Sequence, residues 1–466
     1  MRRSTSSLSQ PQTPGMPPRR EGGLLPRSGS RSGSVLIIVL WVAFGLVSLA
    51  LYFAQSMSFE MRAADQRAAA IEADQAIAGA ARYVTNILGR LEEPGQVPIL
   101  TSYRSEAVPV GDATFWFIGR SDAQSGQATS QNANDIPAFG LKDEGAKLNL
   151  NVATLEMLEA LPRMTTELAA SIIDWRDSND EVTDGGAESM TYLRLNPPYS
   201  CKNTNFESVA ELRMVNGAYL DLLYGEDANL NGILDPNEND GDVATPLDNR
   251  DGRLDFGMFE YLTIYTKASA QGTNVSNRQQ LGELLSERLG AARANQVLAA
   301  LNGPQAAIAT NSVLGFYLAS GLSREEFQPI EGMLVGPNVV GLVNVNTASE
   351  AVLGCLPGIG TTNAPTLVAY RKANTAPREN SMAWVIDAMD RGALTQAARW
   401  LTGRTYQFTA DIAAVGHHGR GYRRVQMVFD TSSGTPIVQY RQDLTHLGWS
   451  LGRRVRETLQ LAKEIR

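Results

Sequence analysis

The feature that most constrains this chain is an uninterrupted apolar run from Val35 to Ala54. Its twenty residues carry no charged side chain, and at about 1.5 Å per residue a helix of this length spans a hydrocarbon core of about 30 Å. A secretory signal has a shorter apolar region, of about 7–15 residues, followed by a small-residue cleavage site. The run is longer and lacks such a site, so it predicts a transmembrane segment, 34–54, that anchors the chain by its N-terminus.

An arginine- and serine-rich leader, 1–33, precedes this run. It holds six arginines and one acidic residue, Glu21, which gives a net charge of +5. By the positive-inside rule, this end stays cytoplasmic and the rest of the chain is translocated. Because the whole chain carries −8, the part after the leader carries −13. So acidic a body argues against nucleic acid or anionic lipid as its main partner.

The rest of the chain divides into segments of different periodicity. A polar, alanine-rich stretch, 55–93, continues the apolar run as a helix that ends before Pro94. A helical and loop-rich region follows from about 147 to 401. Alternating, aromatic-bearing runs on both sides of it predict an α+β fold, in which a mostly α-helical domain is inserted into an antiparallel sheet. The predicted strands are Ala113–Gly119, Tyr406–Val415, Tyr422–Phe429 and Ile437–Gln442.

The helical region contains an internal repeat, in which Asn149–Pro162 matches Asn344–Pro357 at a constant offset of 195 residues. Each match has a helix-capping residue, helical apolar spacing and a terminating proline, and a second helix follows at 167–174 and at 364–372. This is the helix–hairpin–helix pattern, whose glycine-rich turn contacts phosphates in nucleic-acid binders. Only the second copy keeps glycines, at Gly358–Gly360, and few basic residues flank either turn. The pattern therefore favours a packing unit over a phosphate site.

The strongest site motif is Asp227–Glu238, which matches the calcium-loop pattern D-x-[DN]-x-[DN]-G-x5-E at every specified position. Calcium takes about six to eight oxygen ligands, and such a loop supplies them by coiling around the ion. Gly232 makes the sharp bend, and Pro236 suits the first turn of an exiting helix. The predicted ligands are the side chains of Asp227, Asn229, Asn231, Asp235 and Glu238 and the backbone carbonyl of Ile233.

A partial second copy of this loop, Asp248–Asp255, has the aspartates and the glycine, but its twelfth position would be Met258. The segment 226–260 holds ten acidic residues against two arginines, and a cation would relieve their repulsion. The alternative is a solvated acidic loop. Three carboxylates in the first loop predict an affinity on the order of 10⁻⁴–10⁻³ M and a structural role. For a second ion, the predicted ligands are Asp248, Asp251 and Asp255.

Cysteine and histidine give little support to catalysis. Cys201 and Cys355 either pair in an oxidising compartment or serve as small apolar side chains. His417 and His418 are adjacent in a glycine-rich turn, His446 stands alone, and no nucleophile motif accompanies them. A membrane-anchored helix–hairpin–helix protein of DNA binding or uptake is the remaining alternative to a scaffolding role, and the acidic body disfavours it.

Several motifs recur in the order found in a known family. The segment Arg31–Leu40 is similar to the prepilin signal of type II secretion pseudopilins. The remaining motifs are Lys147–Thr154, Ile172–Asp177 with Gly186–Glu188, Pro197–Tyr199, Phe206–Arg213, Tyr261–Tyr265 and Val343–Ala348. Together they resemble the minor pseudopilin K family, also called general secretion pathway protein K.

The resemblance implies a maturation site and a fold. Prepilin peptidase would cleave after Gly33 and leave Ser34 as the new N-terminus. Ile38 stands where most pseudopilins carry glutamate, which is usual for the K member. The family fold is a pilin-like sheet, here 95–146 and 402–450, with an inserted helical domain, 147–401, that binds calcium.

The resemblance also implies a non-enzymatic role at the pseudopilus tip in protein export across the outer membrane. The implied partners are pseudopilins I and J, the major pseudopilin, the inner-membrane secretion platform and prepilin peptidase. The chain would cross the inner membrane once, with its bulk in the periplasm. It departs from the family in its long leader and in 271–341, a predicted insertion. A head of more than 300 residues on one helix is too wide to repeat in a narrow fibre, which also favours the tip.

Overall fold

The computed structural model of this chain describes residues 32–120, 137–243, 245–303, 306–374 and 380–464. The chain divides into two compact units, 1–64 and 65–466. Helix α1 (Ser32–Gly89) contributes residues to both units. The predicted leader, 1–33, lies outside the described residues except for its last two.

In the first unit, α1 carries the apolar run. Within the described residues, it is the one helix long and apolar enough to cross a membrane. Its apolar side chains are exposed, as a lipid environment requires. The predicted cleavage pair, Gly33 and Ser34, lies in the first turn of the helix. The helix ends at Gly89, earlier than the expected residue 93, because glycine is a weak helix former and the residue before Pro94 disfavours helical angles.

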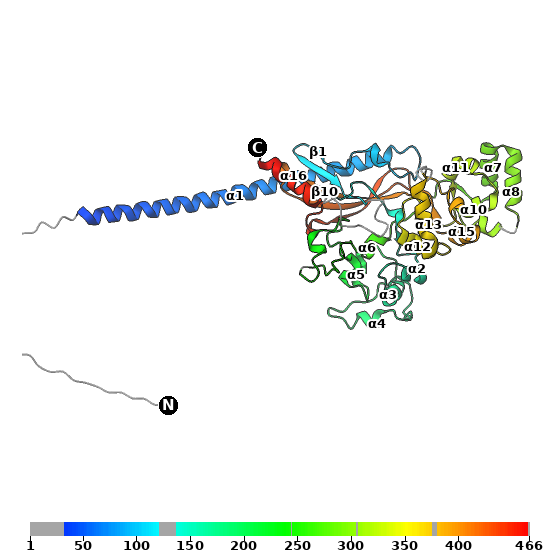
Figure 1. The fold of residues 1–466 in the computed structure, drawn as a ribbon, viewed down its shortest axis with the longest axis horizontal. Coiled ribbons are helices and arrows are strands. Elements are labelled where there is room, and N and C mark those ends of the chain that lie inside the picture. Colours follow the sequence, from blue (N-terminus) through cyan, green and yellow to red (C-terminus); the bar gives the residue numbers. More distant parts are fainter. Residues whose placement is uncertain (1–31, 121–136, 244, 304–305, 375–379, 465–466) are drawn as a thin grey trace, which may run out of the picture. The chain divides into compact units, whose positions relative to one another are not determined.

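The second unit is built around one antiparallel sheet with the strand order β1-β2-β10-β11-β12, in which β3 also pairs with β10. Two separate stretches of chain, 108–143 and 407–443, supply its strands, so the helical region between them is an insertion (Figure 1). The expected α+β class is confirmed. The strands are β1 (Val108–Val110), β2 (Ala113–Phe117), β3 (Lys142–Asp143), β10 (Gln407–Val415), β11 (Arg423–Asp430) and β12 (Ile437–Asp443).

A helix covers each face of the sheet, because successive side chains of a strand point to opposite faces. The second half of α1 packs against the face that carries Phe115, Phe117 and Phe408. On the other face, Trp116 and Val415 pack with residues at the start of α16 (Gly452–Glu464). The sequence did not predict α16, because its arginine-rich pattern shows only a narrow apolar face.

The inserted region is a set of short helices around its own core (Figure 1). Gly290, with φ of 83°, separates two helices where the sequence predicts one helical stretch from Arg278 to Leu301, since this backbone angle suits glycine alone. The helices outside the repeat are α4 (Ser189–Tyr192), α5 (Leu220–Tyr224), α6 (Met258–Tyr261), α7 (Arg278–Leu289), α8 (Ala291–Ala300), α9 (Ala306–Ala309), α10 (Val313–Ser320), α11 (Arg324–Glu331), α14 (Val385–Ala388) and α15 (Arg391–Ala397). One further parallel strand pair joins β6 (Thr273–Asn274) to β7 (Leu334–Val335).

The internal repeat forms the same unit twice, and we call 148–176 the first copy and 343–371 the second copy. Each begins with a short strand that pairs in parallel with a strand further along the chain, and two helices follow it. The first copy contains β4 (Leu148–Asn149), α2 (Leu155–Glu159) and α3 (Thr166–Arg176), and it pairs with β5 (Leu262–Thr263). The second contains β8 (Val343–Asn344), α12 (Glu350–Gly354) and α13 (Gly360–Ala373), and it pairs with β9 (Leu401–Thr402).

Candidate metal centre

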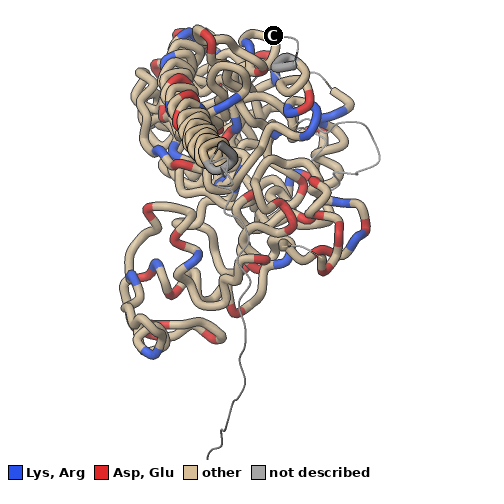
Figure 2. Tube along the Cα trace, turned by 90° about the vertical axis from the view of Figure 1, so that its left-hand side faces the viewer, with Lys and Arg blue, Asp and Glu red and all other residues tan. Residues whose placement is uncertain are grey.

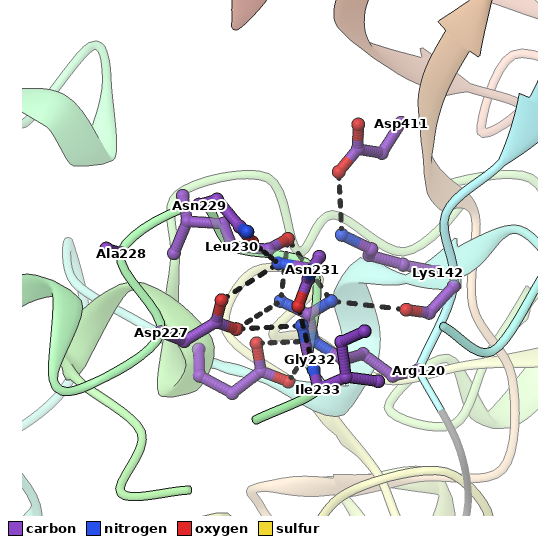
Figure 3. Close-up of polar contacts among 12 residues, drawn as sticks. Arg120, Lys142, Asp227, Ala228, Asn229, Leu230, Asn231, Gly232, Ile233 and Asp411 are labelled. Atoms are coloured by element: carbon purple, nitrogen blue, oxygen red, sulfur yellow. Dashed lines mark hydrogen bonds and ion pairs between the residues drawn. The ribbon is translucent and has the colours of Figure 1, made fainter. Parts of the chain in front are cut away.

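The predicted calcium loop, 227–238, is held in a tight coil by its own backbone (Figure 3). The carboxylate of Asp227 accepts hydrogen bonds from the N–H groups of Asn231 and Gly232, both at 2.9 Å. The side-chain oxygen of Asn229 accepts from the N–H of Asn231 at 3.0 Å. Positive φ angles at Leu230 (54°) and Gly232 (75°) make the bend. These contacts turn the side chains of alternate loop residues inward.

Glu238 closes the loop from its other end. Its Oε1 accepts from the N–H of Ala228 at 3.0 Å, and its Oε2 accepts from the N–H of Asp235 at 2.9 Å. Asp235 in turn accepts from the side-chain amides of Asn229 and Asn231, at 2.7 and 3.0 Å. The loop therefore brings together the five side chains predicted as ligands of the first ion.

The electrostatics of this loop fit a divalent cation. Asp227 and Glu238 are each only 1% exposed. Desolvation, with the added charge of Asp227, raises the pKa of Glu238 to about 9. Burial also raises the pKa of Asp227, and the guanidinium of Arg120 opposes that shift. Calcium would stabilise both ionised carboxylates, and the loop supplies the hard oxygen ligands that calcium prefers.

Arg120, which follows β2, reaches the loop and also pairs with the carboxylate of Glu260. Its Nε lies 2.9 and 2.8 Å from the two carboxylate oxygens of Glu260, and its Nη2 lies 3.8 Å from Asp227 (Figure 3). This arginine therefore neutralises part of the negative charge around the loop and ties the loop to the sheet.

A second ion pair fastens the loop to the sheet. Arg424 on β11 is fully buried, and it pairs with Asp411 on β10 at 2.8 and 2.7 Å. Arg424 also donates to the backbone carbonyls of Asn229 and Leu230. Sequence reasoning missed this link, although a charged residue in each of two apolar strands was a usable signal.

The second acidic segment repeats the turns of the first loop. The side-chain oxygen of Asn249 accepts from the N–H of Asp251, and that of Asp251 accepts from the N–H of Arg253, both at 2.8 Å. The equivalent contacts hold Asn229 and Asn231 in the first loop. The two segments therefore present side-chain oxygens in the same arrangement.

The residues that close this segment come from outside it. Glu226 accepts from the N–H groups of Asn249 and Asp255, at 3.4 and 3.0 Å, as Glu238 does in the first loop. The side-chain oxygen of Asn239 accepts from the N–H of the segment's glycine at 3.2 Å. Both closing residues lie earlier in the chain, so a search that expects glutamate at the twelfth position misses them.

Asp248, one of the predicted ligands, has a different environment. Its carboxylate accepts from the N–H groups of Asp240, Gly241 and Arg250, at 2.7 to 2.8 Å. These bonds fix the chain that leads into the segment. The side chains that hold the turns of the second candidate site are those of Glu226, Asn239, Asn249 and Asp251, whereas Asp255 takes part through its backbone N–H.

A third acidic cluster, Asp174, Asp177 and Glu188, lies at the end of the first copy. Ligand oxygens of the three residues lie within 4.8 Å of one another. Glu188 is 2% exposed, and both of its carboxylate oxygens lack a hydrogen bond of normal geometry. Desolvation and the charges of the two aspartates raise the pKa of Glu188, and the Cys201 thiol and the Ser189 N–H offset only part of this. The cluster therefore also fits a divalent cation.

Each copy of the repeat encloses one arginine. In the second copy, Arg371 donates to the carbonyls of Val345 and Ala348 at 2.8 and 2.9 Å. In the first copy, Arg176 donates to the two carbonyls at the equivalent positions, 195 residues earlier. Both guanidinium groups therefore stabilise the backbone of their own unit. Figure 2 shows acidic and basic positions interspersed over the head in that view, with no continuous basic stripe.

The cysteines and His417 have structural surroundings. Cys201 and Cys355 are buried and free, and burial raises the pKa of their thiols to about 11 and about 12. His417, in the turn η7 (His417–Gly419), lies between two carboxylates of α1. Its Nε2 is 2.9 Å from Asp65, and its Nδ1 is 2.7 Å from Glu72. This histidine therefore holds α1 to the turn that follows β10.

The family model for type II secretion system protein K matches residues 141–223. This range contains the first copy and the third acidic cluster. Over this range, the chain is similar to type II secretion system protein K. The resemblance found in the sequence is confirmed for these residues. None of the curated proteins matches the chain.

One solved structure that resembles this chain is a chain of the GspK-GspI-GspJ complex from the type 2 secretion system of enterotoxigenic Escherichia coli. The identity is 11%, the alignment covers 89% of this chain and 98% of that chain, and the TM-score is 0.37. At that TM-score the likeness adds nothing to the family match.

Proposed function

We propose that this protein is a non-enzymatic minor pseudopilin of a type II secretion system that caps or initiates the pseudopilus tip. The observation that carries the proposal is a protein K domain in a chain whose α1 is long and apolar enough to cross a membrane. In this role the chain crosses the inner membrane once, its bulk lies in the periplasm, and it supports protein export across the outer membrane. The proposed partners are pseudopilins I and J, the major pseudopilin, the secretion platform and prepilin peptidase.

The size of the head supports a position at the tip. A long apolar and alanine-rich helix packs sideways against equivalent helices. The unit 65–466 that α1 carries is much wider than one helix, so copies of it cannot follow one another closely along a thin fibre. Such a subunit ends an assembly.

We further infer that calcium is a structural cofactor of this head. The first loop would hold one ion through Asp227, Asn229, Asn231, Asp235 and Glu238 and the carbonyl of Ile233. The supporting feature in the first loop and in the third acidic cluster is the crowding of buried or half-buried carboxylates, which a divalent cation would neutralise. In the second segment Glu226 is buried, whereas Asp251 and Asp255 are exposed. When bound, the ion would lock the first loop, which is attached to the sheet through Arg120 and Arg424.

A membrane-anchored helix–hairpin–helix protein of DNA binding or uptake is less well supported. Its phosphate site would need free basic groups at the hairpins, but Arg176 and Arg371 bind backbone carbonyls. Retention of the purified protein on DNA with a steep salt dependence would favour this alternative. We expect no such retention.

The experiment that tests the proposed function is N-terminal sequencing of membrane-extracted protein, made with and without prepilin peptidase. We expect a mature N-terminus at Ser34 only when the peptidase is present. A Gly33→Leu variant is the matched control and should stay uncut. An uncut wild-type protein in the presence of active peptidase would contradict the assignment.

A further inference from the structure

Helix α16 carries a charge opposite to that of the head to which it belongs. Its sequence has four basic and two acidic residues, whereas the chain after the leader carries −13. Arg453, Arg454 and Arg456 are all exposed. The Arg453 side chain keeps 67% of its surface exposed although it lies 3.2 Å from Glu457. The outer face of α16 is therefore a basic surface on an acidic head.

The helix is also amphipathic. Its inner side packs on the sheet through Val455, which is buried, and Leu459, which is partly buried. Leu461 is 59% exposed, and Arg456 stacks on the ring of Trp449 at 5.0 Å. Exposed arginines next to an exposed leucine on a short amphipathic helix are typical of helices that lie on anionic membrane surfaces.

A short series of contacts connects α16 to the start of the head. A Cβ on Gly419 in η7 would lie 3.1 Å from Leu459 of α16. The same turn is held to α1 through the contacts of His417 with Asp65 and Glu72. Asp65 is the first residue of the second unit. Helix α16 therefore lies at the end of the head where the anchored chain enters.

The chain between the anchor and this end is short. Ten residues separate Ala54, the last residue of the apolar run, from Asp65, and all ten belong to α1. Ten helical residues rise about 15 Å, and lipid headgroups occupy about 5–7 Å of that length. The remaining distance is about one Debye length at physiological ionic strength, so this length of chain allows the charges on α16 to come within the electrostatic range of the bilayer surface.

We propose that α16 docks on anionic lipid headgroups of the membrane that α1 crosses, and so holds the head at the bilayer before the subunit joins an assembly. This inference rests on the proposed single-pass anchoring. Each arginine near an anionic surface shifts the ratio of docked to undocked heads about fivefold, so the three arginines together shift it on the order of a hundredfold. The main body of the head stays acidic, and the contact is therefore confined to this helix.

The native cysteines allow a clean test with a site-specific fluorophore, because both are buried and burial raises the pKa of their thiols. Gln460→Cys puts the label on the exposed side of α16, one turn after Arg456 and two turns after Arg453. Thr435→Cys puts it in the exposed turn between β11 and β12. There Pro436 lies 3.9 Å from the Cβ position of Gly89, at the opposite end of the head's part of α1.

The labelled full-length protein is reconstituted in phosphatidylcholine nanodiscs, with or without phosphatidylglycerol, that contain a lipid with a quencher on its headgroup. We expect quenching at position 460 only with phosphatidylglycerol, reversed by high salt, and none at position 435. Arg453→Gln with Arg454→Gln should lower the ratio of docked to undocked heads about 25-fold. Arg194→Gln with Arg288→Gln removes the same charge from exposed sites on the inserted domain and should change nothing.

The possible results separate the two proposals. Equal fluorescence at position 460 in both bilayers, from protein retained in the disc, would overturn the docking and leave the anchor intact. Protein that does not insert into the disc would overturn the proposed function. The label at position 460 could instead become protected only when pseudopilin heads are added, at either lipid charge. That result would assign α16 to a contact between subunits and overturn the docking. If the double arginine variant unfolds, quenching at position 460 of the protein with wild-type arginines, compared with and without phosphatidylglycerol, still decides whether α16 docks.

Discussion

The two copies of the repeat share one framework and differ in what they hold. Both enclose an arginine that binds carbonyls at equivalent positions. The first copy has Asp174 and Asp177 where the second has Ala369 and Lys372. The carboxylates therefore play no part in the framework, because the second copy folds without them. The proposed cation cluster therefore has no counterpart in the second copy.

The hairpins of the two copies differ in a second way. Arg163 in the first hairpin has φ of 62°, and the equivalent residue in the second, Gly358, has φ of 82°. Both hairpins need a left-handed residue, but only one uses the residue type that adopts it without strain. At Gly358 the neighbouring chain is also close, since a Cβ there would lie 2.3 Å from the carbonyl oxygen of Ala393.

The largest effect should come from filling that space in the second copy. Gly358→Ala combines a strained backbone angle with a clash against a backbone oxygen, and we expect a loss of about 4 kcal/mol in the free energy of unfolding. Gly321→Ala is the matched control: it has a similar φ, of 65°, but no atom within 4 Å of the added Cβ. Urea unfolding measures both. Equal losses would show that the close approach at Gly358 contributes nothing.

The enclosed arginines should be equally important in the two copies. Arg176→Met and Arg371→Met each leave two backbone carbonyls without their donor, and each should cost about 2–3 kcal/mol. Urea unfolding of both variants, beside Arg288→Met as an exposed control, tests this. If Arg371→Met were neutral and its protein bound DNA less well, the arginine would have a phosphate-binding role instead.

Calcium should stabilise the head through the first loop, which lies outside both copies. With free calcium at about 100 times the Kd, one occupied site stabilises the folded state by about 2.7 kcal/mol, and a calcium chelator should lower the thermal midpoint accordingly. Asp227→Ala with Glu238→Ala should abolish the increment of the first loop. Glu283→Ala with Glu287→Ala, which removes two exposed acids of α7, should keep it. A thermal midpoint that is the same with chelator and with calcium would contradict the proposed cofactor.

The pH dependence should reverse with the ion. The pKa of Glu238 is raised to about 9 in the folded state, from a usual value of 4.5, so the calcium-free fold binds the extra proton. Its stability should therefore fall by a few degrees in midpoint as pH rises from about 5 to 9. Glu238→Gln should remove this part of the slope. A calcium-free slope that is identical in wild type and variant would contradict the buried, protonated carboxyl.

The smallest effect is expected at the first hairpin. Arg163→Gly relieves the left-handed strain, but it loosens the unfolded chain and removes the hydrogen bond to the carbonyl of Asp221. These terms oppose each other, so the free energy of unfolding should change by less than about 0.5 kcal/mol. A loss comparable to that of Gly358→Ala would mean that the two hairpins are under the same packing constraint.

Patterns local in the sequence predicted much of this molecule. Twenty apolar residues indicated the first part of α1, alternating side chains indicated β10 and β11, and the offset of 195 residues indicated the two copies. The motif 227–238 picked out residues that do come together in one loop. In each case, the information lies within one short segment of the sequence or in the comparison of two such segments.

The features that were missed depend on residues distant in the chain. Glu226 and Asn239 close the second acidic segment from outside its motif. The pair Asp411 and Arg424 reaches the first loop from strands about 190 residues away, and the contacts to its carbonyls exist only after folding. Helix α16 has too narrow an apolar face to be recognised. Periodicity and motif spacing carry no information on such contacts.

The most direct test of the account is hydrogen–deuterium exchange of the detergent-solubilised full chain, read by mass spectrometry with calcium and with chelator. The account predicts that calcium slows exchange in peptides from 226–255, and in those around Asp174 and Glu188, while peptides from 343–371 exchange at the same rate. Equal protection of both copies, or no protection in either, would contradict a cation-binding first copy and a purely structural second one.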